Sequence, residues 1–123
     1  MSGPLAGTMI VSLAVNLPGP YAAERLTAMG ATTIKIEPPA GDPLHHVAPE
    51  LYRTLSVGQD IRTVDLKNDE GRQVLEDLLA SSDVFITAMR PAALRRLGLD
   101  DAVERPPQLT HIEIVGYDGA DSD

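Results

Sequence analysis

The sequence predicts an α/β fold in which a mostly parallel sheet is flanked by helices. Short apolar runs alternate along the chain with segments whose apolar residues recur at helical spacing. Alternation of this kind is typical of parallel strands joined by helical crossovers. The 123 residues, of which 43% are hydrophobic and 23% charged, suffice for one domain with its own core.

The chain opens with the pattern of a strand followed by a helix. Residues 9–14 (MIVSLA) form a short apolar run, and the turn 17–20, with two prolines and a glycine, follows it. A helix is expected over residues 21–29, because its apolar side chains fall on one face and Gly30 can stop it.

A second strand and a long loop come next. Residues 33–37 alternate in polarity like a strand, whereas residues 38–58 show no clean period and are expected to form a loop with room for one helical turn. The pair His45-His46 lies in this loop near Asp42. Neighbouring histidines point in different directions and no third ligand stands at metal-binding spacing, so we expect no metal site.

The remaining elements continue the alternation. Residues 61–66 are expected to form a strand, and Asn68 can cap a helix whose first turn carries two acids. Further strands are expected at 83–87 and 110–115, with a brief helix over 91–97 between them.

Three predicted loops follow strand ends, at 15–20, 38–48 and 87–91, where ligands of parallel sheets bind. Arg90 stands at the start of a helix, and its guanidinium could grip a phosphate or carboxylate or pair with a local acid; both readings are open at this point. Arg96 stands in the last turn of the same helix, where the helix dipole alone favours a cation.

Composition excludes several classes of function. A formal net charge of −8 repels a phosphate backbone, so nucleic-acid binding is disfavoured. The chain has no cysteine for thiolate chemistry and no apolar stretch long enough to span a bilayer. His111 is expected to be packed within a strand rather than catalytic. We therefore expect a cytoplasmic protein that binds neither nucleic acid nor membrane.

Five segments become informative when they are taken together and in order. They are PLAG at 4–7, PGPYAAERLTAMGATTIKIEPPAGDPL at 18–44, VDLKNDEGRQVLEDLLASSDVFI at 64–86, MRPAALRRLGL at 89–99 and IEIVGYDG at 112–119. This set resembles the opening of the family III CoA-transferases, which include formyl-CoA and carnitine CoA-transferases and α-methylacyl-CoA racemase.

The resemblance implies a Rossmann-like large domain, of which residues 1–123 would be a single N-terminal segment, with the small domain absent. Family members form interlocked homodimers and move CoA between an acyl-CoA and a carboxylic acid through an aspartyl intermediate. Coenzyme A is therefore the implied ligand, and no metal is implied. By position, Arg90 and Arg96 match family arginines at the CoA site, and Leu17 falls on the loop that borders the pantetheine channel.

Departures from the family pattern affect both binding and chemistry. Pro38 stands where many members have a basic residue, and Gln59-Asp60 stands where many have a lysine. The resemblance puts the catalytic aspartate downstream of Gly116-Tyr117, after Asp123, so the chain is expected to be truncated before its nucleophile and to have no catalytic residue of its own.

Two alternatives remain beside a transferase. An acyl-CoA racemase of the same family would need a histidine near Tyr117, and none stands there. A non-catalytic module that binds CoA or a partner subunit would fit the missing nucleophile and the missing basic residues.

Overall fold

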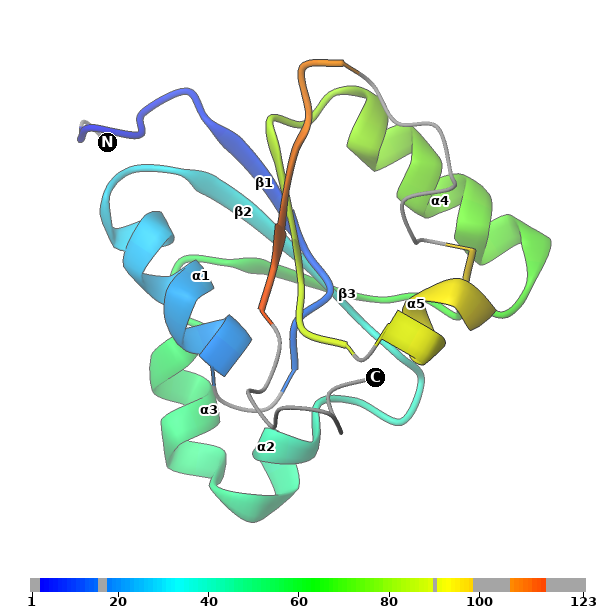
Figure 1. Cartoon of the computed structure of the whole chain (residues 1–123). Coiled ribbons are helices and arrows are strands. Elements are labelled where there is room, and N and C mark those ends of the chain that lie inside the picture. The colour runs from blue at the N-terminus through cyan, green and yellow to red at the C-terminus, as the bar shows by residue number, and fades with distance from the viewer. Residues whose placement is uncertain (1–2, 16–17, 90, 99–106, 115–123) are drawn as a thin grey trace.

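The computed structural model describes residues 3–15, 18–89, 91–98 and 107–114. The strands are β1 (Met9–Ser12), β2 (Thr32–Glu37), β3 (Asp60–Thr63), β4 (Val84–Thr87) and β5 (Thr110–Glu113). They form one sheet in the order β3-β2-β1-β4-β5, and every neighbouring pair is parallel (Figure 1). The predicted α/β fold with a mostly parallel sheet is confirmed.

Helices cover both faces of the sheet. They are α1 (Pro18–Ala28), α2 (Pro43–Val47), α3 (Pro49–Leu55), α4 (Asp69–Ala80) and α5 (Pro91–Arg96). Figure 1 shows α1, α2 and α3 on one face and α4 and α5 on the other. The chain steps outward from β1 to β3 and then returns past β1 to β4, so its direction across the sheet reverses between β1 and β4.

Two apolar clusters fill the space between the sheet and its helices. The cluster on the α4 face consists of Val11, Leu13, Ile34, Ile36, Leu75, Leu79, Phe85 and Leu94. The cluster on the α1 face consists of Ile10, Ala14, Ala23, Ala31 and Ile86. Small residues let α1 approach the sheet, since a Cβ added to Gly19 would lie only 2.1 Å from the Cβ of Ala14.

The prediction of a long loop over residues 38–58 is wrong for α2 and α3. Both helices begin at a proline, whose missing N–H has no partner in the first turn of any helix. The Asp42 carboxylate caps α2 by accepting a hydrogen bond of 2.9 Å from the Leu44 N–H. These helices are too short to show an apolar period, and caps and contacts with the rest of the fold stabilise them.

The other predicted helices are confirmed, with shifted ends. Asn68 caps α4 by accepting a hydrogen bond of 2.7 Å from the Gly71 N–H, and α1 starts earlier than expected, at Pro18. The strand predicted over 61–66 ends at Thr63, so the following residues belong to a loop. Among the described residues, no helix combines the length and apolarity that crossing a membrane requires.

Candidate functional site

A pocket of about 430 Å³ opens at the carboxyl ends of the strands. Its walls come from the segments that follow β1, β2, β3 and β4 and from the residue that follows α5. The lining residues are Leu13, Val15, Ile36, Pro38, Pro39, Ala40, Val64, Asp65, Leu66, Lys67, Met89 and Leu97. The pocket therefore lies where ligands of open parallel sheets bind, beside the reversal between β1 and β4.

The lining of the pocket is almost entirely apolar. Leu13 and Ile36 also belong to the apolar cluster of the α4 face, so the pocket continues that core outward. Asp65 and Lys67 are the charged side chains in the lining. Within the described ranges, the Lys67 ammonium forms no ion pair. The pocket can thus take a ligand with an apolar body and an anionic group near Lys67.

The wall formed by residues 64–67 is held by the start of α4. The Lys67 N–H donates to the Asp65 carboxylate at 3.0 Å, which closes a tight local turn. A Cβ on Gly71 would lie 1.9 Å from the Asp65 carbonyl oxygen, so only glycine lets α4 approach this loop so closely. The loop and the helix are therefore fixed as one unit.

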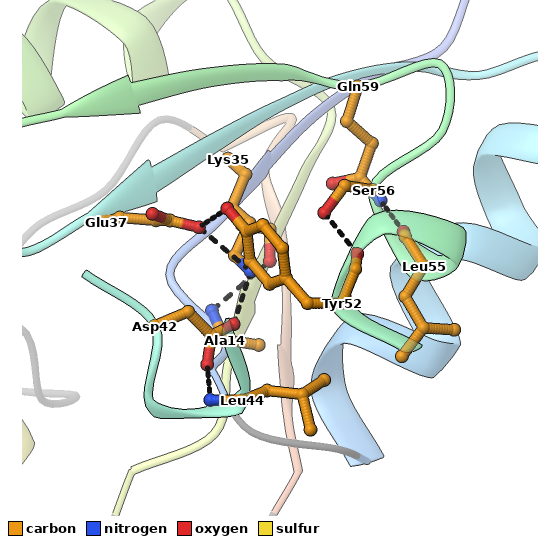
Figure 2. Close-up of polar contacts among 10 residues, drawn as sticks. Ala14, Lys35, Glu37, Asp42, Leu44, Tyr52, Leu55, Ser56 and Gln59 are labelled. Carbon is orange, nitrogen blue, oxygen red and sulfur yellow. Dashed lines mark hydrogen bonds and ion pairs between the residues drawn. The ribbon is translucent and has the colours of Figure 1, made fainter. Parts of the chain in front are cut away.

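A buried polar cluster lies on the opposite face of the sheet, between β2, α2 and α3. We call it the Lys35 cluster; it consists of Lys35, Glu37, Asp42 and Tyr52 (Figure 2). The Lys35 ammonium lies 2.5 Å from Asp42 Oδ2 and 3.3 Å from Glu37 Oε2. The Tyr52 hydroxyl donates to Glu37 Oε2 at 2.5 Å. Lys35, Glu37 and Asp42 are 2%, 6% and 0% exposed.

Tyr52 is held in its neutral form by this environment. Burial and, after it, the Glu37 carboxylate that accepts its hydrogen bond together raise the pKa of its hydroxyl to about 12. The ring also stacks at a tilt against His45, with centroids 4.8 Å apart, and lies 4.9 Å below the Lys35 ammonium. Tyr52 is thus a fixed hydrogen-bond donor at neutral pH.

His45 and His111 pack against aromatic rings. His45 packs on Tyr52, and the described residues contain no group of three potential ligands that could hold a metal ion. The prediction that His111 is packed is confirmed: its ring stacks on Phe85 with centroids 4.9 Å apart, and its Nε2 lies 2.9 Å from the Thr87 hydroxyl.

Of the three residues predicted to bind CoA, the structure describes only Arg96. Leu17 and Arg90 lie outside the described residues. Arg96 is exposed at the end of α5 and precedes Leu97, which lines the pocket, but Arg96 itself is not part of the lining. Residues from all three predicted loops do line the pocket: Val15, Pro38, Pro39, Ala40 and Met89.

Sequence reasoning missed the wall formed by residues 64–67. The prediction extended the third strand to residue 66, so the carboxyl end of that strand was assigned to the sheet instead of the pocket. The Asn68 cap correctly marks the start of α4, but the run before it carries no signal that ends β3 at Thr63.

Comparison with known proteins gives a consistent result. Residues 5–123 match the family description "CoA-transferase family III". The chain is 34% identical to the cinnamoyl-CoA:phenyllactate CoA-transferase of Clostridium sporogenes, over 91% of this chain and 30% of that protein. It is also 34% identical to the human succinyl-CoA:glutarate CoA-transferase, over 93% of this chain and 28% of that protein.

Solved structures agree with the sequence matches. The crystal structure of a CAIB/BAIF family protein from Brucella suis superposes with a TM-score of 0.84 at 31% identity, over 95% of this chain and 34% of that chain. The chain therefore spans about a third of the length of the relatives that it matches.

Proposed function

The chain belongs to CoA-transferase family III, and from this premise we propose that it forms the coenzyme A site of an enzyme that moves CoA between carboxylic acids. The observation that supports the proposal is the pocket at the carboxyl edge of the sheet. Residues from the carboxyl ends of four strands line it, its walls are mostly apolar, and its Lys67 ammonium makes no ion pair with another described residue. CoA has the matching chemistry: a long pantetheine arm and an anionic nucleotide end.

The proposed contacts divide between arm and phosphates. Leu17 and its loop would border the arm, while Arg90 and Arg96 would meet the phosphates together with Lys67. The position of Pro38 in the pocket wall means that this chain presents an apolar surface where many family members have a cation. Gln59 does not replace the missing lysine either, because its side-chain amide donates to the Leu55 carbonyl at 2.8 Å. The remaining cations therefore carry more of the binding.

Titration of CoA into the chain and its variants tests this site. Arg90→Ala removes a charge-assisted hydrogen bond and should weaken binding roughly tenfold to a hundredfold. Lys67→Ala should weaken binding in the same direction. Arg62→Ala is the matched control, because Arg62 pairs with Asp60 on the exposed edge strand β3 and does not line the pocket. Equal affinities for wild type and Arg90→Ala would remove Arg90 from the site.

For the transfer step, we propose that the nucleophilic aspartate is supplied from outside these 123 residues. Asp65 is the carboxylate in the pocket lining, but it accepts the Lys67 N–H and its loop is fixed by α4. Acyl-CoA donors mixed with free acids and this chain should therefore show no exchanged thioester by mass spectrometry. A longer protein that contains this chain should show exchange and an enzyme-bound acyl or CoA adduct.

The same assay separates the competing functions. Racemisation of a chiral 2-methylacyl-CoA without exchange would favour a racemase. CoA binding without either reaction in the longer protein would favour a non-catalytic module. We also propose that the longer protein is a homodimer, and light scattering that reports a monomer would contradict this.

A further inference from the structure

We propose that Lys35 is a positioning residue for the pocket, although it lies on the other face of the sheet. Its single ammonium holds Glu37 and Asp42, the two residues between which the chain arches over the sheet edge. We call residues 38–41 the arch. The relevance of the arch to a ligand rests on the proposed CoA site, whereas the fixation of the arch by Lys35 does not.

The arch is part of the pocket but has little support of its own. Pro38, Pro39 and Ala40 line the pocket and are exposed to solvent. One backbone hydrogen bond, from the Gly41 N–H to the Pro38 carbonyl at 2.8 Å, closes the turn, and Gly41 has a φ of 84°. The position of a short exposed segment that is closed by one such bond depends on where its two ends are held.

Both ends of the arch are held by a fully paired set of buried groups. Each carboxylate has two partners: Glu37 accepts a hydrogen bond from the Tyr52 hydroxyl and forms an ion pair with Lys35. Asp42 accepts hydrogen bonds from the Lys35 ammonium and from the Leu44 N–H. Figure 2 shows the contacts from Glu37 and Asp42 meeting at the Lys35 ammonium. A buried charge without a partner is costly in free energy, so Glu37 and Asp42 must both stay in contact with the Lys35 ammonium. This requirement fixes the distance between the two ends of the arch. Lys35 thereby sets the position of the pocket wall.

The test requires a variant that folds without the charges of the Lys35 cluster. The triple variant Lys35→Met, Glu37→Gln and Asp42→Asn leaves no unpaired buried charge, and the asparagine oxygen can still cap α2. The exposed pair provides the matched control, Arg62→Met with Asp60→Asn, since its members lie outside the arch. If the triple variant does not fold, the same measurements are made on Asp42→Asn alone. In that variant, Lys35 and Glu37 remain as an ion pair whose charges balance.

Two measurements are made on each folded variant. Hydrogen exchange at the Gly41 amide reports the order of the arch, and exchange at the Leu13 amide, which bonds the Ile86 carbonyl at 2.8 Å, reports the central sheet. In the triple variant, we expect the Gly41 amide to exchange at least about tenfold faster while exchange at the Leu13 amide is unchanged, and CoA to bind about tenfold more weakly. The control variant should change neither.

The outcomes separate this inference from the proposed function. Unchanged exchange at Gly41, or equal acceleration at Gly41 and Leu13, would show that the Lys35 cluster only stabilises the fold. Failure of the wild-type chain to bind CoA would count against the proposed function, while the exchange at Gly41 would still decide whether Lys35 fixes the arch. Faster exchange at Gly41 with unchanged CoA affinity would overturn the role of the arch in binding.

Discussion

The two faces of strand β2 are both buried, one by apolar contacts and the other by ion pairs and hydrogen bonds. On the α4 side, Ile34 and Ile36 join an apolar cluster that continues into the pocket. On the α3 side, Lys35 and Glu37 are as deeply buried but make ion pairs and hydrogen bonds to α2 and α3. Apolar contacts are non-directional and tolerate small shifts, whereas paired charges fix distances. The apolar side should therefore dominate stability, and the charged side should dominate geometry.

The largest expected effect comes from the apolar side. Phe85→Ala removes a fully buried ring that packs in the α4-face cluster and stacks on His111, so the free energy of unfolding should fall by about 3–5 kcal/mol. Urea unfolding measures this change. Ile112→Ala, at a 39% exposed position, is the control and should cost less than about 1 kcal/mol. A similar loss in both variants would contradict the assignment of the core.

A smaller loss in the free energy of unfolding is expected when Asp42 is removed from the charged side. Asp42→Ala removes the cap of α2 and one partner of Lys35, but Glu37 remains to pair with the ammonium. The loss should be about 1.5–3 kcal/mol, the range for hydrogen bonds to charged groups. Unfolding in urea gives the value, and a loss as large as that of Phe85→Ala would mean that the charged side dominates stability as well.

Tyr52→Phe should lower the free energy of unfolding modestly at neutral pH and should change how that free energy depends on pH under alkaline conditions. Removal of one hydrogen bond to Glu37 should cost about 1–2 kcal/mol. The pKa of Tyr52 is raised from 10.0 to about 12, mainly by burial and then by Glu37. Below pH 10 both the folded and the unfolded chain keep the proton; above it the unfolded chain releases the proton first, so stability falls between pH 10 and about 12.

The phenylalanine variant lacks this group and should lose less stability over the same pH window. The measurement is the free energy of unfolding at several pH values for both proteins. Parallel curves for wild type and Tyr52→Phe would show that Tyr52 has an ordinary pKa.

The smallest effect is expected at an ion pair outside both buried regions. Arg62 and Asp60 are paired at 2.8 Å on β3, with side chains 46% and 54% exposed. Arg62→Ala should change the free energy of unfolding by less than about 1 kcal/mol, and high salt should abolish the difference. Thermal unfolding at low and high salt tests this, and a larger effect would weaken the distinction between buried and exposed pairs.

The sequence predicts the sheet well because the pattern that marks each strand lies within a few consecutive residues. β1 and β4 are short apolar runs and β2 alternates in polarity. Stops such as Gly30 and Gly98, with φ of 109° and 70°, mark the helix ends correctly. The helices α2 and α3 escape prediction because their stability depends on contacts between distant residues: Tyr52 reaches back 15 positions to Glu37. No periodic pattern of apolar residues records such a contact.

The candidate site is predictable only in part, for a related reason. Parallel strands place their carboxyl ends at one edge, so loops such as that of Met89 could be expected there. The depth of the pocket depends on where each strand stops, and the run around Val64 does not show that β3 ends at Thr63. The Lys35 cluster is not predictable from the alternation of β2, which places Lys35 on a face that is usually apolar.

The position of β1 in the sheet has a consequence for synthesis on the ribosome. The Met9 N–H bonds the Asp83 carboxylate, 74 residues further along the chain, and β1 pairs with β4 from Ile10 onward. A ribosome that adds roughly 5–20 residues per second needs roughly 4–15 s for that stretch. Until β4 is made, one edge of β1 has no neighbour although β2 already can pair with the other. The strand order thus creates an interval in which the growing sheet offers an open edge to other chains.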